Sequence, residues 1–441
     1  MIPRLSLVSC VILVLALANP AGLRAQDALI PGSHPLVQTQ DVGVYHLTLE
    51  DAKQRALATN KDLGLAHLAI KEKGELTAAA RTDYLPKLIG NVTYFHFNSD
   101  LGVVNTIRTG QRGILPPGSR TFAVNAVNQD SSLASITLAQ PITKLIAVNA
   151  AVKIAKADEE IAQAQLDEGV RGLLTGVAQA FHGLLGAQRI ETALRLQVGF
   201  AEQLSRTNPS PEIRVAAIEA KQALNQVHGQ TIDIAEQMNN LIGLPAGTIL
   251  VLEEPMPPAP PVHSAEEAAS LALSCNPKVR EAMAGSRKAH AAMQVARSDF
   301  LPDVNVFGSY FNQTAAPIIQ DNFGAFGLSA SYTFVDWGKR RHVKHQREFQ
   351  IAQAQKNVQA TIDKVVLEAR QAYGSFEQAD EALKLAFEMV NARKDAEGTL
   401  KLPPAIQAAQ AATAKAELEH LHAEANYRVA HAKLMNVIGA H

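Results

Sequence analysis

Hydrophobic positions in the second half of the chain recur every seven residues, in two parallel rows. The first row consists of Ile362, Ala369, Phe376, Leu383 and Val390, and the second, at an offset of three, of Val358, Val365, Ala372, Ala379 and Ala386. The first half repeats this ladder, with rows that run from Leu166 to Leu194 and from Val170 to Val198, and only Glu191 interrupts it. Such rows are typical of the a and d positions of a coiled coil, so they predict long helices that pack against neighbouring helices.

The rows also indicate how long these helices are. A helix from about Pro141 to Arg206 would extend roughly 95 Å at a rise of ~1.5 Å per residue. Helices of this length are far outside the usual globular range, so partner helices must support them along their whole extent.

Shorter segments alternate between apolar and polar residues with a period of two. The clearest one carries Phe326, Leu328, Ala330, Tyr332 and Phe334, separated by Gly, Ser and Thr. Runs of about ten residues with this period suit tilted strands of a membrane β-barrel. They suit a half-buried sheet of a soluble protein equally well, so the strands alone leave both interpretations open.

The two halves of the chain also match each other at a fixed shift. Leu85-Pro86 and Leu301-Pro302 lie 216 positions apart, and the residues around them match at the same shift without a gap. This pattern predicts two structural repeats, 48–252 and 264–441, joined by the Pro-rich linker 253–263. Each repeat is expected to run helix, strand, loop, strand, very long helix, turn, helix.

Within these repeats, single first helices are expected from about Thr48 to Leu85 and from Ser264 to Leu301, each stopped by a Leu-Pro pair. Loops are expected between the strands, a long one at Ser99–Asp130 with several Gly and Pro residues, and a short one at Asn312–Asn322.

The N-terminus is typical of a secretory signal peptide, residues 1–25, with Arg4 before an apolar segment. Ala25 is the expected cleavage point, and Ala21 is the alternative. A lipoprotein signal ending at Cys10 is the alternative. An N-terminal extension, 26–47, would follow. Only Cys10 and Cys275 occur, so processing would leave one Cys and no intramolecular disulfide.

Composition narrows the possible functions. The chain has 41 Lys and Arg against 42 Asp and Glu, and this balance argues against a nucleic-acid partner. Phosphate-binding glycine loops and the nucleophile elbow are absent from the sequence. His342 and His345 could share a helix face, but two ligands make an incomplete metal site. We therefore expect no enzyme activity, no cofactor and no metal.

Taken together, these features resemble the TolC outer-membrane factor family. The resemblance rests on the order of several motifs, which are LTLEDA at 47–52, Asn60, the two Leu-Pro pairs, Gln140-Pro141, FVDWGKR at 334–340, and the closing LIG at 241–243 and VIG at 437–439. It covers nearly the whole chain after the signal segment.

The resemblance implies a mainly α protein with a membrane β-barrel. Long coiled-coil helices would form a periplasmic α-barrel, and four strands per protomer would complete a 12-stranded barrel in a homotrimer. The implied function is an outer-membrane channel of a tripartite efflux or type I secretion system, a passive conduit that contacts lipid, a periplasmic adaptor protein and an inner-membrane pump. A periplasmic coiled-coil adaptor or scaffold protein is the alternative.

Two groups of candidate site residues follow. The resemblance puts a gate and an adaptor contact at the periplasmic tip, for which the candidates are Arg206, Lys394, Asp395, Glu397, Gly398 and Lys401. Family members commonly carry acidic residues just after the second turn, where this chain has Ala405 and Ala408, which puts cation selectivity there in doubt. The alternative is that the charged candidates at the tip are ordinary helix residues solvated by water. Candidates for the membrane interface are Tyr94, Tyr310, Tyr332 and Trp337.

Overall fold

The computed structural model describes residues 43–99, 101–108, 119–207, 210–253, 255–316, 319–398 and 403–439. All of its helices and strands belong to the unit Val44–His441. The expected signal peptide, 1–25, and the extension up to residue 42 lie outside the described residues.

Eight helices and eight strands make up the described part of this unit. The helices are α2 Leu49–Thr59, α3 Lys61–Thr82, α4 Lys144–Thr207, α5 Pro211–Leu241, α6 Ala265–Cys275, α7 Pro277–Ser298, α8 Lys339–Gly398 and α9 Pro403–Ile438. The strands are β1 Val44–Leu47, β2 Lys87–His96, β3 Leu101–Arg108, β4 Ser119–Val127, β5 Asp130–Pro141, β6 Ile249–Leu252, β7 Asp303–Gln313 and β8 Asn322–Ser331.

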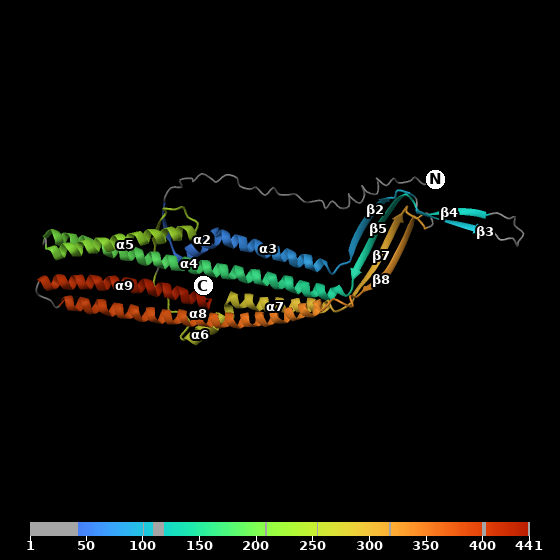
Figure 1. Ribbon diagram of the computed structural model, residues 1–441. Helices are drawn as coiled ribbons and strands as arrows, with labels where there is room; N and C mark the ends of the chain where they lie inside the picture. The colour runs from blue at the N-terminus through green and yellow to red at the C-terminus, as the bar shows by residue number, and fades with distance from the viewer. Residues whose placement is uncertain are drawn as a thin grey trace. The chain divides into compact units, whose positions relative to one another are not determined.

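Two very long helices organise the unit, as the heptad rows predict. Helix α4 has 64 residues and α8 has 60. Helix α4 packs against α3, α5, α7 and α9, whereas α8 packs against α7 and α9 (Figure 1). Both are therefore supported by partner helices, which a helix of such length requires.

The helices that precede the sheet differ from the expectation. The segment expected as one helix from Thr48 to Leu85 is divided at Asn60 into α2 and α3, and its counterpart is divided at Asn276 into α6 and α7. Each Asn has an extended backbone, and its side-chain oxygen accepts a hydrogen bond from a backbone N–H of the next helix, Leu63 (3.0 Å) or Lys278 (2.9 Å). An Asn in this role caps a new helix and so ends the previous one.

A four-stranded antiparallel sheet, in the order β2-β5-β7-β8, lies at the end of the long helices where α3 and α7 end (Figure 1). Its strand number agrees with the expected four strands. The expectation of a loop across Ser99–Asp130 is wrong, because β3 and β4 pair there as a second, antiparallel sheet. The division into two repeats and a linker stays a prediction.

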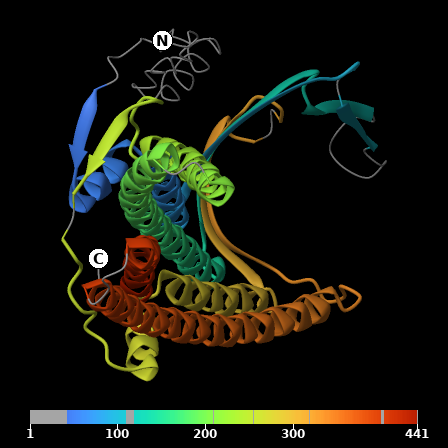
Figure 2. The same cartoon turned by 90° about the vertical axis from the view of Figure 1, so that its left-hand side faces the viewer.

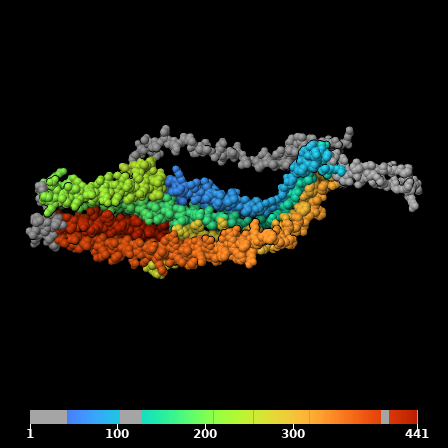
Figure 3. Space-filling view, viewed as in Figure 1, coloured from blue at the N-terminus to red at the C-terminus, as the bar shows by residue number. Residues whose placement is uncertain are grey.

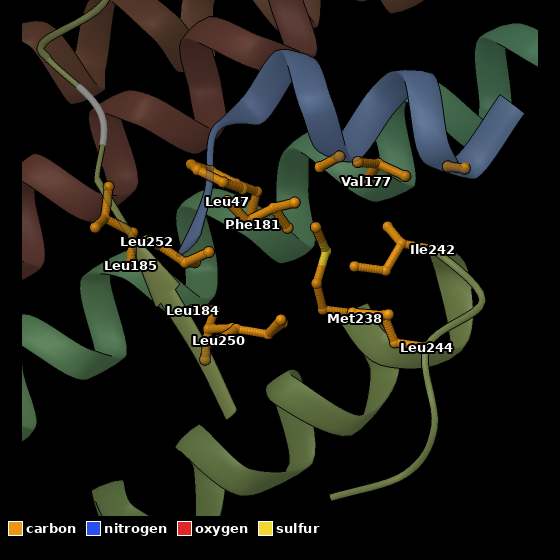
Figure 4. Close-up of a cluster of buried hydrophobic side chains, with 12 residues drawn as sticks. Leu47, Val177, Phe181, Leu184, Leu185, Met238, Ile242, Leu244, Leu250 and Leu252 are labelled. Atoms are coloured by element: carbon orange, nitrogen blue, oxygen red, sulfur yellow. The ribbon is translucent and has the colours of Figure 1, made fainter. Parts of the chain in front are cut away.

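A hydrophobic core joins the middle of α4 to its neighbours. Strands β1 and β6 form a short parallel sheet beside α4 (Figure 2). Phe181 and Leu184 of α4 pack there with Met238 and Ile242 from the end of α5, and all four are fully buried (Figure 4). Burial of each such side chain contributes about 1.5–3 kcal/mol, so this cluster holds α2, α4, α5 and the β1–β6 pair together.

Candidate membrane sheet and helical hairpin tips

One face of the four-stranded sheet is apolar and exposed. Residues that pair directly across strands share a face, and the pairs Leu88–Leu138, Ile136–Tyr310 and Val306–Leu328 therefore belong together. With Phe326, which is 95% exposed, they form what we call the apolar face. In the space-filling view, the orange segment that contains β8 forms part of the visible surface (Figure 3). A continuous apolar face of this kind marks contact with lipid or with a partner.

The opposite face of the sheet is more polar. Its residues include Asn91, Thr93 and Ser329, and the hydroxyl groups of Thr137 and Ser309 lie 2.8 Å apart across β5 and β7. Phe307, Phe311 and Phe323 also lie on this face. The two faces therefore differ in their share of polar residues, as the lipid side and the water side of a membrane strand do.

The aromatic candidates divide between the two ends of the sheet. Tyr94 and Tyr310 lie towards the end away from the helices, and the Tyr94 hydroxyl donates to Asp130 Oδ1 over 2.6 Å. Tyr332 and Trp337 follow β8, where the chain enters α8. Aromatic residues at both ends of an apolar band are typical of the two membrane–water interfaces.

A tight turn connects β8 to α8. Trp337 has a positive φ of 54° and is 93% exposed, and Gly338 follows with a φ of 85°. The Asp336 carboxylate accepts hydrogen bonds from the backbone N–H groups of Arg340 (3.1 Å) and Gly338 (3.0 Å), and these bonds lower the pKa of Asp336. Since a non-glycine residue rarely adopts positive φ, the Asp336 hydrogen bonds help to hold the turn that presents Trp337.

At the α8–α9 tip, two of the candidate residues contact the returning helix. Lys394 forms an ion pair with Glu417 (2.9 Å), and the Glu397 carboxylate accepts a hydrogen bond from Thr413 (3.1 Å). Gly398 ends α8, Asp395 lies among the last residues of this helix, and Lys401 lies outside the described residues.

The α4–α5 tip carries a related arrangement. Arg206 lies in the last turn of α4, and the nearby Glu202 pairs with Lys221 of α5 over 2.7 Å. The hydrogen bond and charge of Lys221, with a smaller effect of Arg206, lower the pKa of Glu202. Sequence reasoning missed the partners Glu202, Lys221, Thr413 and Glu417. Equal spacing from the turn does not find them, because Lys394 lies four residues before the end of α8 and Glu417 fourteen residues after the start of α9.

Other chemistry proposed from the sequence can also be located. His345 pairs with Glu348 over 3.0 Å instead of joining His342. Among the described residues, no three His, Cys, Asp or Glu side chains come together in a group that could hold a metal ion. Within the same part of the chain, none of the helices combines the length and the apolar character that a membrane-spanning helix requires.

Long paired helices and a short sheet with an exposed apolar face define the class of outer-membrane channel proteins. The chain belongs to the outer membrane efflux protein family, whose model matches residues 52–243 and 268–397. The family resemblance, the fold class and the location in the outer membrane with a helical extension into the periplasm are thereby confirmed. No curated protein matches the sequence.

Solved structures share the fold at low sequence identity. The outer-membrane channel OprN aligns with a TM-score of 0.70 at 16% identity, over 89% of this chain and 90% of that one. The open state of the Neisseria gonorrhoeae MtrE outer membrane channel aligns with a TM-score of 0.67 at 16% identity, over 89% and 88%. A membrane protein from Pseudomonas aeruginosa aligns with a TM-score of 0.67 at 17% identity, over 89% and 93%.

Proposed function

We propose that three copies of this chain assemble into one closed channel that leads from the periplasm through the outer membrane. The observation that carries this proposal is the four-stranded sheet, which has an exposed apolar face and has β2 and β8 as its edges. Lipid tolerates no open sheet edge, because the unpaired N–H and C=O groups of an edge find no partner there.

Pairing β8 of one copy with β2 of the next satisfies both edges at once. Each of these strands has ten residues, so their lengths match. Four strands are too few to close a barrel, whereas three copies contribute twelve, a number within the range of membrane barrels. In the same assembly, the long helices of three copies would surround a periplasmic passage.

The channel is proposed to act as a passive conduit in a tripartite efflux or type I secretion system. An inner-membrane pump would supply the energy, and a periplasmic adaptor protein would join the pump to this channel. The α4–α5 and α8–α9 tips lie at the end of the unit away from the sheet (Figure 1), and we assign the periplasmic entrance and the adaptor contact to them. Arg206, Lys394, Asp395, Glu397, Gly398 and Lys401 are the candidate residues.

The second candidate function is that of a soluble periplasmic coiled-coil adaptor or scaffold. Long paired helices are compatible with such a soluble protein. An exposed apolar face on the sheet is not, because in a soluble protein this face would be in contact with water. Particle mass in mild detergent, measured on protein from the outer-membrane fraction, distinguishes the two. A trimer is expected, and a soluble periplasmic monomer would favour the scaffold.

Disulfide cross-linking tests the proposed closure directly. Within one chain, β5 and β7 separate β2 from β8, which amounts to about 14 Å at ~4.8 Å per strand and exceeds the ~7 Å reach of a disulfide. Single cysteines along β2, combined with single cysteines along β8 in a Cys275→Ser background, should therefore yield only cross-links between chains. The control pair Ser309→Cys with Ala325→Cys, which face each other on β7 and β8, should cross-link within one chain.

A further inference from the structure

Two strand pairs of the four-stranded sheet, β2–β5 and β7–β8, correspond to each other residue by residue. In the first pair Leu88 lies opposite Leu138, and in the second Val304 lies opposite Ala330. A shift of 216 positions carries β2 onto β7, and a shift of 192 carries β5 onto β8. Under these shifts each pair of residues in the first ladder falls on a pair in the second. Strands β5 and β8 are therefore equivalent, and so are β2 and β7.

One contact within the chain then predicts a contact between copies. Strand β5 pairs with β7 in the middle of the sheet, and β2 and β8 are the outer strands (Figure 1). The equivalent of the β5–β7 contact is β8 beside β2 of the next copy. Within the chain Thr137 lies opposite Ser309. The two shifts turn this pair into Ser329 opposite Thr93 of the next copy.

The side chains at this position suit the predicted pairing. The hydroxyl groups of Thr137 and Ser309 lie 2.8 Å apart within the chain. Ser329 and Thr93 carry the same two kinds of hydroxyl group in exchanged places. Both side chains are exposed, and neither hydroxyl has a hydrogen-bond partner among the described residues. Pairing between copies would give each hydroxyl a partner.

The same register continues the apolar face from one copy to the next. Ile136 lies opposite Tyr310 within the chain, and the equivalent pair is Leu328 opposite Tyr94 of the next copy. Both of these side chains are exposed in the single chain. A slip by one residue would bring apolar side chains to the polar face. The apolar face therefore excludes odd slips, and the β5–β7 contact selects one register among the even ones.

Helices α4 and α7 continue the β5–β7 contact below the sheet. Lys153 of α4 donates to α7 over 3.3 Å, and Ala157 follows it by one helical turn. Lys288 of α7 pairs with α4 over 2.6 Å, and Ala284 precedes it by one turn. Residues one turn apart share a helix face, so both alanines lie in the seam between α4 and α7. Ala157 is 3% exposed and Ala284 is 1% exposed.

The equivalent seam between copies would lie between α8 and α3 of the next copy. The two shifts carry Ala157 to Phe349 of α8, and Leu68 of α3 to Ala284. In the single chain Phe349 is 76% exposed and Leu68 is 61% exposed. Two large apolar side chains in water thus occupy positions whose equivalents are buried, which favours a covering partner at both.

We propose that β8 pairs with β2 of the next copy with Ser329 opposite Thr93, and that Phe349 and Leu68 lie in the adjoining seam between α8 and α3. The occupant of this surface is a second copy of the chain. The interface rests on the proposed closed channel, which brings β8 and β2 together but leaves their register and the helix contact open.

Three double-cysteine variants in a Cys275→Ser background test the register. Each combines Ser329→Cys with one cysteine on β2, which is Thr93→Cys at the predicted partner or Asn91→Cys or Phe95→Cys two residues to either side. Residues directly opposite each other lie within the ~7 Å reach of a disulfide, whereas diagonal neighbours are about 7–8 Å apart. Under oxidation Thr93→Cys should give several-fold more covalent oligomer than either neighbour, measured by non-reducing electrophoresis.

The matched control is Thr137→Cys with Ser309→Cys, the equivalent pair within the chain, which should cross-link without forming oligomers. Where Ser329→Cys does not assemble, Ser331→Cys with Asn91→Cys measures the same register. An intact trimer that cross-links best at a shifted pair, equally at all three pairs, or at none while the control pair does, overturns the register and leaves the channel standing. A soluble monomer would instead contradict the channel itself.

A second comparison tests the helix seam. Leu68→Gln changes a side chain that is exposed in the single chain, so it should leave the helix content unchanged and lower the share of trimer in mild detergent several-fold. Leu196→Gln is the control, because Leu196 is 74% exposed on α4, which has helices of its own chain as neighbours. Circular dichroism measures helix content and particle mass the share of trimer. An equal loss of trimer in both variants, or no loss in Leu68→Gln, overturns the proposed seam.

Discussion

The carboxylate of Glu191 on α4 lies 2.9 Å from Nδ1 of His228 on α5. Arg195, one turn further along α4, donates to the same carboxylate over 2.5 Å. Glu191 is only 7% exposed and occupies the position that interrupts the heptad row of α4. An otherwise apolar seam therefore contains a buried carboxylate whose partners come from both helices of the α4–α5 hairpin.

Replacing Glu191 by Leu should not lower stability, because Leu restores the apolar row and a buried ion pair is often no better than a packed hydrophobic residue. Its partners Arg195 and His228 are both about half exposed or more, so water can solvate them. Glu191→Ala should instead lower the melting temperature, since it leaves a void. Thermal unfolding in detergent, followed by circular dichroism, compares the two variants. A loss in Glu191→Leu as large as in Glu191→Ala would contradict this account.

The same carboxylate predicts part of the pH dependence. Burial raises the pKa of Glu191, but the hydrogen bonds and charges of Arg195 and His228 outweigh it and lower this pKa below 4.5. The folded protein then binds the proton less readily than the unfolded chain, so the stabilisation is present above pH ~4.5 and is lost as the pH falls through the folded pKa. Melting temperatures measured from pH ~6 to ~3 should decline less steeply in Glu191→Leu than in the original protein. Equal slopes would show that Glu191 contributes nothing to acid sensitivity.

Two glycines three residues apart on α4 should respond in opposite ways to alanine. A Cβ at Gly186 would lie 2.6 Å from Cβ of Ala425 on α9, whereas a Cβ at Gly183 meets nothing within 4 Å. Gly183→Ala should stabilise by about 0.5–1 kcal/mol through helix propensity, while Gly186→Ala should destabilise by about 1–3 kcal/mol because α4 and α9 must separate. Denaturant unfolding measures the change in the free energy of unfolding of both variants. If Gly186→Ala is also more stable than the original protein, the contact between α4 and α9 accommodates the added methyl group.

The long helices are the part of the fold that the sequence predicts best. A helix expected from about Pro141 to Arg206 is observed at Lys144–Thr207. Heptad rows allow this accuracy because one seam has to stay apolar over the whole length. The breaks at Asn60 and Asn276 were within reach too, since Asn is a preferred cap and Pro277 suits the first helical position.

Features that depend on distant residues could not be predicted in this way. The strands β3 and β4 lie in a segment whose Gly and Pro residues favour a loop, and only their mutual pairing makes them a sheet. The partner of Lys394, Glu417, becomes evident only when the hairpin turn is fixed. His182 of α4 and His431 of α9 are 249 positions apart in the sequence and line one cavity only because α4 and α9 pack against each other.

Charge reversal at the α8–α9 tip should change ion flow more than stability. The side chains of Lys394 and Glu417 are 56% and 49% exposed, and exposed pairs contribute at most ~1 kcal/mol. If the tips line the channel entrance, Lys394→Glu should alter single-channel conductance in planar bilayers, and adding Glu417→Lys should restore it. Lys384→Glu, which disrupts the pair with Asp380 within α8, is the control further from the turn. Equal effects of Lys384→Glu and Lys394→Glu would argue against a special role of the tip.

Arginine substitutions on the two faces of β8 should separate a membrane sheet from a soluble one. Phe326 lies on the apolar face near the middle of β8, opposite Gly308, and its neighbour Ala325 lies on the polar face, opposite Ser309. An arginine near the middle of the bilayer costs about 2–4 kcal/mol on a lipid-facing position and far less towards an aqueous interior. Phe326→Arg should therefore lower the amount of trimer in the outer-membrane fraction, and Ala325→Arg should leave it nearly unchanged. If both variants accumulate normally, the apolar face does not contact lipid, and a soluble scaffold becomes the better explanation of the long helices.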